Sequence, residues 1–245
     1  MQRYFIQLSY LGTRYHGWQV QPNGNSIQEV LEKSLSVVLR ENVAVTGAGR
    51  TDAGVHASFY VAHFDSLSNT ADTADFVYCM NKFLPDDIAI QTIRKVDPEF
   101  HARFSAQLRT YLYVISRVKN PFNTWLAYYF PAHLDLEKMN FAAGILHEYE
   151  DFTSFSRLHT DVKTNLCHIS VARWEERSGE LVFTITADRF LRNMVRAIVG
   201  TLIDVGRGKI SAEDFRKIIE KKRSSGSRSI GTGSRFVSCR HFVSG

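Results

Sequence analysis

A glycine-rich loop between two predicted strands lies in the stretch Val45-Thr46-Gly47-Ala48-Gly49-Arg50-Thr51-Asp52-Ala53-Gly54-Val55-His56-Ala57. Residues 43–46 before the loop and 55–64 after it have the alternation of half-buried strands. The three glycines let the backbone turn tightly and approach another molecule closely. The loop also carries one cation, Arg50, and one carboxylate, Asp52. We expect a rigid scaffold to present this charged pair to solvent or to a ligand.

The segments around this loop predict a β-α-β-β-α-β order for the first hundred residues. The predicted strands are 4–10, 43–46, 55–64 and 88–96, and the predicted helices are 27–38 and 73–84. Ser26 with Glu29 three residues later predicts a capping box for the first helix. Pro85 is expected to end the second helix. This order is the split βαβ of ferredoxin-like units, on which many RNA-binding modules are built.

The second half of the chain repeats this order. The predicted strands are 109–117, 167–175 and 180–187, and the predicted helices are 135–147, 190–205 and 211–222. Ser178-Gly179 predicts the turn of a hairpin. The expected fold class is therefore α+β, with two ferredoxin-like (βαββαβ, RRM-like) units whose antiparallel sheets carry packed helices. We expect an N-terminal domain over 1–104, which holds the loop 47–54, and a C-terminal domain over 105–245.

The tail over 223–245 is atypical for this fold. It is rich in Ser, Gly and Arg and shows little alternation before residue 235. A final strand is expected here to complete the second unit, and its pattern is weak.

The composition is that of a soluble globular protein, with 44% hydrophobic and 22% charged residues among 245. Thirty Lys and Arg against 25 Asp and Glu give a net charge of +5, which permits a polyanionic partner without demonstrating one. No apolar run is long enough to span a bilayer, and the N-terminus lacks the apolar core of a signal peptide. Cys79, Cys167 and Cys239 are widely spaced, which argues against a disulfide framework and fits a reducing cytoplasm best.

The ordinary interpretation of Asp52 is a turn aspartate that bonds its own backbone. Three glycines, the neighbouring Arg50 and the following His56 favour a functional role instead. The loop lacks the Gly-Lys-Ser/Thr of a phosphate-binding loop and does not complete G-x-G-x-x-G. The segment after the loop resembles a strand, so the helix N-terminus that binds a phosphate is missing.

Metal and hydrolase chemistry find little support in the sequence. His16, His56, His63 and His101 include no pair with tight ligand spacing, so scattered histidines are favoured over a metal site. No nucleophile elbow supports a Ser/His/Asp hydrolase. The sequence predicts neither a cofactor nor a metal.

Two other features fit contact with a nucleic acid. Tyr111 lies on a predicted strand, where a packed aromatic is the ordinary interpretation, but base stacking also uses a tyrosine on a sheet face. Arg189, just before the predicted helix 190–205, and Arg192 and Arg196 within it are spaced i, i+3, i+7 on one helical face, opposite the apolar stripe. Such a face is usually only solvated. Three arginines without an interleaved carboxylate can also bind phosphate.

The segment Gly49–Ala57 resembles the signature of the TruA family of tRNA pseudouridine synthases. Further motifs resemble that family in the same order: Tyr10-Leu11-Gly12-Thr13, Gly17-Trp18-Gln19, Asn81 with Leu84-Pro85 and Asp87-Ile88, Phe100–Ala106 followed by Tyr111 and Tyr113, Asp151–Phe155, and Phe190–Arg196. The resemblance covers most of the chain. The expected departure is Ser224–Gly245, where the family usually has an apolar strand after a loop with Pro and Gly. A reading-frame change in the source gene would produce such a switch.

The resemblance implies isomerisation of uridines at positions 38 to 40 of the tRNA anticodon stem-loop. Asp52 matches the catalytic nucleophile, which attacks the sugar or the base or assists elimination at the ribose; the sequence leaves these routes open. Tyr111 matches the tyrosine that stacks on the target uracil, and Arg196 matches the basic partner of the aspartate. Arg50 would lie where the uridine leaves the stem. The family needs no cofactor, and the resemblance implies a cytoplasmic homodimer without a membrane partner.

Two alternative functions stay open. One is a non-catalytic RNA-binding module of the same fold, in which Asp52 is only a turn residue. The other is a metal-dependent nuclease that uses Asp52 and nearby histidines. The sequence does not disclose which tRNAs are substrates.

Overall fold

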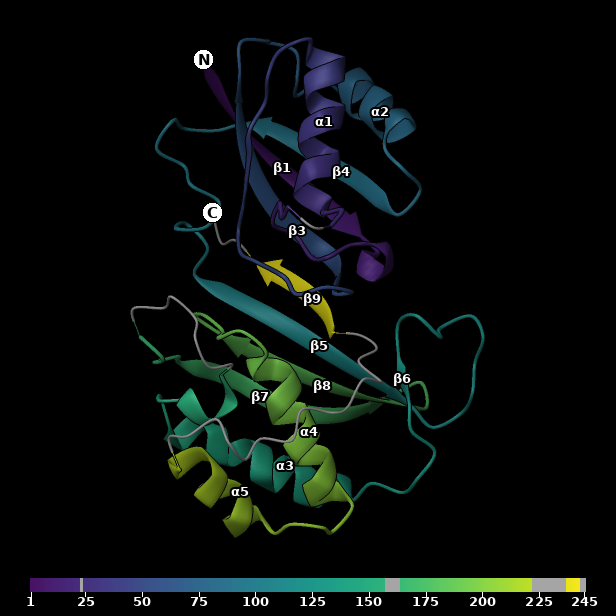
Figure 1. Ribbon diagram of the computed structural model, residues 1–245, viewed down its shortest axis with the longest axis vertical. Helices are drawn as coiled ribbons and strands as arrows, with labels where there is room; N and C mark the ends of the chain where they lie inside the picture. Colours follow the sequence, from purple (N-terminus) through teal and green to yellow (C-terminus); the bar gives the residue numbers. More distant parts are fainter. Residues whose placement is uncertain (23, 157–163, 222–236, 243–245) are drawn as a thin grey trace. The chain divides into compact units, whose positions relative to one another are not determined.

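The computed structural model describes residues 1–22, 24–156, 164–221 and 237–242 (Figure 1). The chain divides into two compact units. Unit 1 comprises Met1–Gln107 with Cys239–Gly245, and unit 2 comprises Leu108–Ser238. Because compactness does not test independent folding, the division into domains 1–104 and 105–245 stays a prediction. No helix within the described ranges is both long and apolar enough to cross a membrane.

Unit 1 has the predicted β-α-β-β-α-β order. Its elements are β1 (Gln2–Tyr10), α1 (Ile27–Leu39), β2 (Val45–Gly47), β3 (His56–Ser66), α2 (Ala74–Phe83) and β4 (Ile88–Lys95), with a short 3-10 helix at Gly12–Arg14. The strands lie in the order β4-β1-β3-β2, and every neighbouring pair is antiparallel. This is the ferredoxin-like arrangement, and the predicted fold class is confirmed for this unit.

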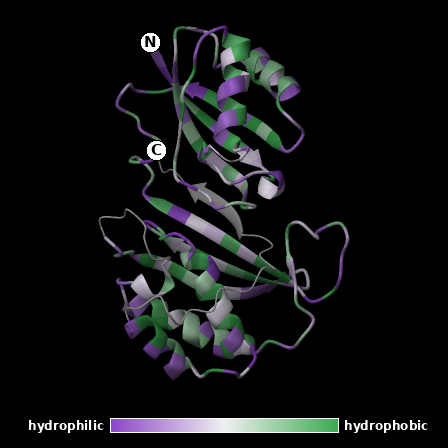
Figure 2. Cartoon of the chain, in the orientation of Figure 1, coloured by the Kyte–Doolittle hydropathy of each residue, from purple (hydrophilic) through white to green (hydrophobic). Residues whose placement is uncertain are grey.

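One face of β1 supplies the main core of unit 1. Its alternate residues from Tyr4 to Tyr10 are buried together with Leu31 and Leu35 of α1. The helix is banded with hydrophobic and hydrophilic residues, as expected of an amphipathic helix on a sheet (Figure 2). The Ser26 Oγ caps the helix by accepting from the Glu29 N–H at 3.2 Å. The predicted capping box is only half formed, because the Glu29 carboxylate pairs with Lys33.

The segment after β4 contributes a second apolar cluster to unit 1. Ala102 and Ala106 pack with Ala48 and Val61, and the aromatic side chains of Phe5, Phe59 and Phe100 lie against this group. The Ala102 N–H also donates to Nδ1 of His63 at 3.1 Å. Ala48 of the glycine loop, and Val61 and His63 of β3, are therefore packed against other residues of unit 1.

Unit 2 repeats the alternation of strands and helices. Its elements are β5 (Leu108–Ser116), β6 (Tyr128–Tyr129), α3 (Leu136–Ile145), β7 (Ile169–Arg177), β8 (Glu180–Ala187), α4 (Met194–Gly206) and α5 (Ala212–Glu220), with 3-10 helices at Leu146–Glu148 and Thr153–Phe155. β5, β8 and β7 are antiparallel neighbours, and β6 runs parallel to β5. The hairpin turn at Ser178-Gly179 is confirmed, since both residues have positive φ values of 51° and 80°.

The predicted final strand is present as β9 (Val237–Phe242). Residues 222–236 and 243–245 lie outside the described part, so most of the atypical tail is not described.

The start of α4 differs from the prediction. Asn193 has a left-handed backbone with φ 67°, and the helix begins only at Met194. Arg189 and Arg192 therefore precede the helix, and the predicted i, i+3, i+7 face of three arginines is wrong. Spacing alone does not distinguish a helical turn from the loop that leads into it. Arg196 lies in the first turn of α4, which contains no acidic residue.

Candidate active site

The loop between β2 and β3 alternates buried and accessible residues. Thr51 and Val55 are buried, whereas Asp52 is half-buried and Arg50 is exposed. The Val55 N–H donates to the backbone carbonyl of Asp52 at 3.2 Å, and Gly54 supplies the positive φ of 77° that this turn needs. Within the described residues of unit 1, no hydrogen bond or ion pair engages the Asp52 carboxylate. The predicted loop therefore presents that carboxylate at the surface of unit 1 without using it to cap the turn.

The backbone of this loop is clamped by residues that follow β1. The Trp18 N–H donates to the Thr51 carbonyl at 3.3 Å, and the Gly54 N–H donates to the Tyr15 carbonyl at 3.2 Å. Gly17 has φ +88°, and a Cβ at this position would lie 2.2 Å from the Thr51 carbonyl oxygen. The clamp therefore requires the absence of a side chain at residue 17.

Tyr60 supports the first half of the loop from β3. Its hydroxyl donates to the Gly49 carbonyl, and its hydroxyl oxygen accepts from the Gly49 N–H at 3.3 Å. The ring of Tyr60 stacks on Trp18 with a centroid separation of 4.2 Å. Tyr60 was not predicted as a site residue, because an aromatic in a buried strand gives no sign that its hydroxyl binds a loop.

Asp87 anchors the clamp at its far end. Its carboxylate accepts from the Tyr15 hydroxyl at 2.6 Å and from the Arg14 Nε at 2.8 Å, and its carbonyl accepts from the Leu11 N–H at 2.8 Å. Burial and the hydrogen bond to Asp87 raise the pKa of the Tyr15 phenol. In the sequence, Asp87 stands out only as part of the motif Asp87-Ile88 that resembles the family. Its position after Pro85 is the signal that could have pointed to this role.

The histidines near the loop have structural partners. His56 is buried and its Nδ1 accepts from the Gly12 N–H at 3.1 Å, while Nδ1 of His63 accepts from Ala102. His101 lies beside His63, with ring centroids 4.8 Å apart, and His16 is exposed. In the described ranges no group of three or more His, Cys, Asp or Glu side chains could hold a metal ion.

Unit 2 places the other two predicted site residues on neighbouring elements. Tyr111 pairs with Ile185 across β5 and β8 and is half-buried, with its ring edge-on to Phe190 at 4.9 Å. Burial raises the pKa of Tyr113, two residues along β5, and the positive charge of the nearby Arg196 opposes that shift. Arg196 is half-buried as well. The structure thus carries Arg50 with Asp52 on unit 1 and Tyr111 with Arg196 on unit 2.

A family model described as tRNA pseudouridine synthase matches residues 7–105 and 149–232. The chain belongs to this family. The residues matched to the tRNA pseudouridine synthases include Arg50, Asp52 and Arg196, whereas Tyr111 lies in the unmatched segment 106–148. The match extends to residue 232, into the tail whose departure from the family is predicted from residue 224 onward, and that departure stays a prediction.

Individual pseudouridine synthases of bacteria are similar over nearly the whole chain. The tRNA pseudouridine synthase A of Bacteroides thetaiotaomicron is 60% identical, over 91% of this chain and 83% of that protein. The enzyme of the same name from Bacteroides fragilis is 58% identical, over 91% of this chain and 88% of the relative. That of Bacillus licheniformis is 41% identical, over 90% and 91%. The predicted family is therefore confirmed, and with it the enzyme class, an isomerase.

Proposed function

We propose that this chain isomerises uridine to pseudouridine at positions 38 to 40 of the tRNA anticodon stem-loop, with Asp52 as the nucleophile. Membership of the pseudouridine synthase family supports the reaction, and the relatives' names support tRNA as the substrate. The observation that carries the assignment of Asp52 is its half-buried carboxylate, which the backbone of a clamped loop presents without using it.

The reaction breaks the N1–C1′ bond of uridine and joins C1′ to C5 of the turned base. The proton on C5 is released and N1 gains one, so atoms balance and no electrons are exchanged. A carboxylate can attack the sugar or the base, or assist elimination at the ribose. In each route the loop must hold the Asp52 oxygens in place while the base rotates, and the clamp by Trp18 and Tyr15 supplies that rigidity.

The other three residues act on the extruded nucleotide. Tyr111 stacks on the uracil and helps to move the C5 proton. Its ring is half-buried and packs edge-on against Phe190, which holds the ring in place and leaves part of its surface accessible to the base. Arg196, half-buried in the first turn of α4, is the basic partner of Asp52, as the resemblance of Phe190–Arg196 to the family's motif implies. Arg50, which is exposed, steers the phosphate where the uridine leaves the stem. We further propose that the enzyme acts as a homodimer in the cytoplasm.

Release of tritium from tRNA labelled at uridine C5 tests this proposal. Replacing Asp52→Asn keeps the shape of the side chain but removes the nucleophilic carboxylate, so we expect release to fall by roughly a thousandfold or more. Binding of tRNA should change less than about twofold, because the loop backbone is held by main-chain contacts.

The same assay separates the alternative functions. Binding of tRNA without any release by the wild-type protein would indicate a non-catalytic RNA-binding module. Cleavage of the RNA that stops when a chelator is added would indicate a metal-dependent nuclease. Undiminished release by the Asn variant would reject Asp52 as the nucleophile.

A further inference from the structure

A cluster of exposed apolar side chains lies in the connection that surrounds β6, residues 117–131. Phe122 is 95% exposed, Val118 73%, Trp125 53%, Tyr129 49% and Leu126 44%. The connection projects from the end of β5 beyond β6 (Figure 1). Five exposed apolar side chains within residues 118–129 are more than the single exposed residues that are ordinary on a surface, and such a concentration favours a binding site.

The connection is ordered by its own hydrogen bonds. The Phe130 N–H donates to the Ser116 carbonyl at 2.9 Å, and the Ala127 N–H donates to the Asn123 carbonyl at 3.0 Å. The Asn123 side chain in turn donates to the carboxylate of Glu180 at the start of β8. The aromatic rings are therefore held on a fixed support, as binding loops usually are.

The charge of this connection favours a polyanion. Residues 117–134 contain no Asp or Glu, but they include Arg117 and Lys119. Arg207, directly after α4, lies over the Phe130 ring at 5.6 Å. The carboxylate against this segment, that of Glu180 at the start of β8, accepts from the Asn123 side chain. Exposed aromatics with nearby cations, in a segment that carries no acidic residue of its own, are a combination that binds nucleobases by stacking and phosphates by charge.

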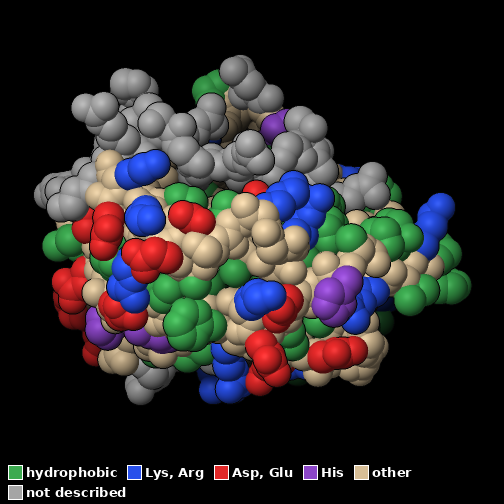
Figure 3. Space-filling model, turned by 90° about the horizontal axis from the view of Figure 1, so that it is seen from below, with side chains coloured by type: hydrophobic (Ala, Val, Ile, Leu, Met, Phe, Trp, Pro, Cys, Tyr) green, Lys and Arg blue, Asp and Glu red, His purple; other side chains and the backbone are tan. Residues whose placement is uncertain are grey.

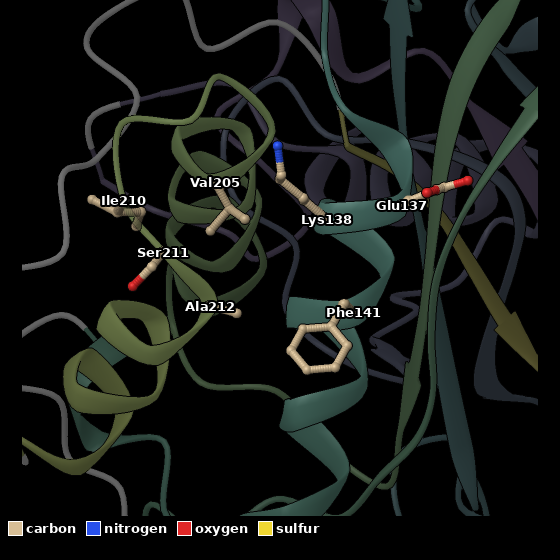
Figure 4. Close-up of a pocket in the computed structure, with 7 residues that line it drawn as sticks. All are labelled: Glu137, Lys138, Phe141, Val205, Ile210, Ser211 and Ala212. Carbon is tan, nitrogen blue, oxygen red and sulfur yellow. The ribbon is translucent and has the colours of Figure 1, made fainter.

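Phe141, another exposed aromatic of unit 2, does not lie in a segment free of acidic residues. Phe141 borders an apolar pocket of about 370 Å³ between α3 and the start of α5, where Glu137 and Lys138 lie side by side in sequence (Figure 4). Acidic and basic side chains are likewise interspersed on the face that Figure 3 presents. The absence of acidic side chains is thus particular to the sequence of the connection rather than general to the surface.

The connection begins well along β5 from Tyr111. Tyr111 and Ser116 are five residues apart on β5, which corresponds to about 17 Å along the strand. The connection also falls in the segment 106–148 that the family model does not match. A nucleotide bound at 117–131 is therefore not the nucleotide that stacks on Tyr111.

We propose that residues 117–131 form a second RNA-binding surface, on which Phe122 and Trp125 stack on bases of the tRNA remote from the reacting uridine. The identity of the RNA rests on the proposed function. Long RNA is the fitting partner because it can occupy this surface and the region of Tyr111 at once.

Trp125 allows a direct test, because the protein has three tryptophans and the other two, Trp18 and Trp174, are each 2% exposed. Stacking of a base on Trp125 should quench the tryptophan emission when unmodified tRNA is added. Trp125→Leu removes the aromatic ring and should weaken tRNA binding by roughly five- to a hundredfold, with the loss in KM rather than in kcat. Trp125→Phe keeps a stacking ring and should bind within about threefold of wild type.

Phe141→Leu is the matched control, since it shortens an exposed aromatic of the same unit beside mixed charges. It should leave tRNA binding unchanged. Equal affinities of the Trp125→Leu variant and the wild type would overturn the proposal, as would equal losses for Trp125→Leu and Phe141→Leu. Sedimentation of each variant tests the competing occupant: a change from dimer to monomer without loss of RNA affinity would assign the surface to a second copy of the chain.

Binding is measured in the Asp52→Asn background, so that turnover does not enter the result. Failure of tritium release by the wild type, combined with a selective loss for Trp125→Leu, would reject the isomerase and retain the RNA surface. Tritium release by the wild type, combined with unchanged tRNA binding by the Trp125→Leu variant, would retain the isomerase and reject the RNA surface.

Discussion

At the scale of single residues, the position of Asp52 depends on contacts made by its neighbours rather than by Asp52 itself. Thr51 accepts from Trp18, and Gly54 donates to Tyr15. These main-chain contacts survive most side-chain substitutions in the loop. They are sensitive to a change that pushes the two backbones apart, and a side chain at residue 17 would do so.

Gly17→Ala should therefore damage both stability and activity. The new methyl group would meet the Thr51 carbonyl at 2.2 Å, and φ +88° strains any L residue. We expect a loss of about 1–3 kcal/mol in the free energy of unfolding by urea. Because displacement of a catalytic group by about 1 Å can cost a hundredfold in rate, tritium release should fall further than stability alone explains.

Gly144→Ala provides the control for this prediction. Gly144 lies in α3, and a Cβ there would meet nothing within 4 Å. A methyl group in a helix should raise stability by about 0.5–1 kcal/mol. If Gly17→Ala were as stable and as active as this control, close approach at residue 17 would not position the loop.

At the scale of elements, the start of α4 separates the arginines that the sequence grouped together. Arg196 is half-buried in the first turn of the helix, whereas Arg192 is exposed before it. The left-handed backbone of Asn193 lies between them and changes the direction of the chain. The two arginines therefore should not play equivalent roles.

Replacing Arg196→Met should reduce tritium release by about a hundredfold but tRNA binding by less than about threefold. Met keeps the packing of the aliphatic part of the arginine side chain and removes its charge. Arg192→Met should at most weaken binding modestly and reduce its dependence on salt. Single-turnover rates and equilibrium binding for the two variants distinguish these effects. Parallel losses of rate and affinity for Arg196→Met would make it an ordinary phosphate contact.

At the scale of the whole molecule, stability should depend on pH through a buried histidine. Burial, together with the positive charges of Arg3 and His101, lowers the pKa of His63 to about 4. The neutral ring is required because its Nδ1 accepts from the Ala102 N–H. The unfolded chain, with a pKa near 6.5, binds this proton more readily than the folded chain does.

The free energy of unfolding should therefore fall as pH decreases from about 6.5 to 4, and this contribution should level off below 4. The loss from His63 is at most about 3 kcal/mol, at 1.36 kcal/mol per pKa unit. His63→Asn retains an acceptor for Ala102 without titrating, so its stability should decline less over the same interval. Urea unfolding of both proteins at pH 7, 5.5 and 4 measures the difference. Identical pH profiles would show that His63 is not the titrating group.

Much of this architecture was predictable because its signals are local. Alternation along β1 and β3, the cap at Ser26 and the turn at Ser178 each act over a few residues, so the order of elements follows from short windows of sequence. The fold class and the family were both predicted correctly. The end of α4 was also close to its prediction, while its beginning was not, because periodicity continues through residues 190–193 although the backbone there is not helical.

What the sequence by itself determined was the order of strands and helices, the glycine loop with Asp52, and the family to which the chain belongs. Only the tertiary structure decided which groups hold that loop, since Tyr15, Trp18 and Asp87 are distant from it in sequence and Tyr60 reaches back to it from β3. It also decided that His56 and His63 accept backbone hydrogen bonds rather than acting as free side chains. The physical reason is that hydrogen bonds and close backbone approach depend on distances in space, and no local pattern records them.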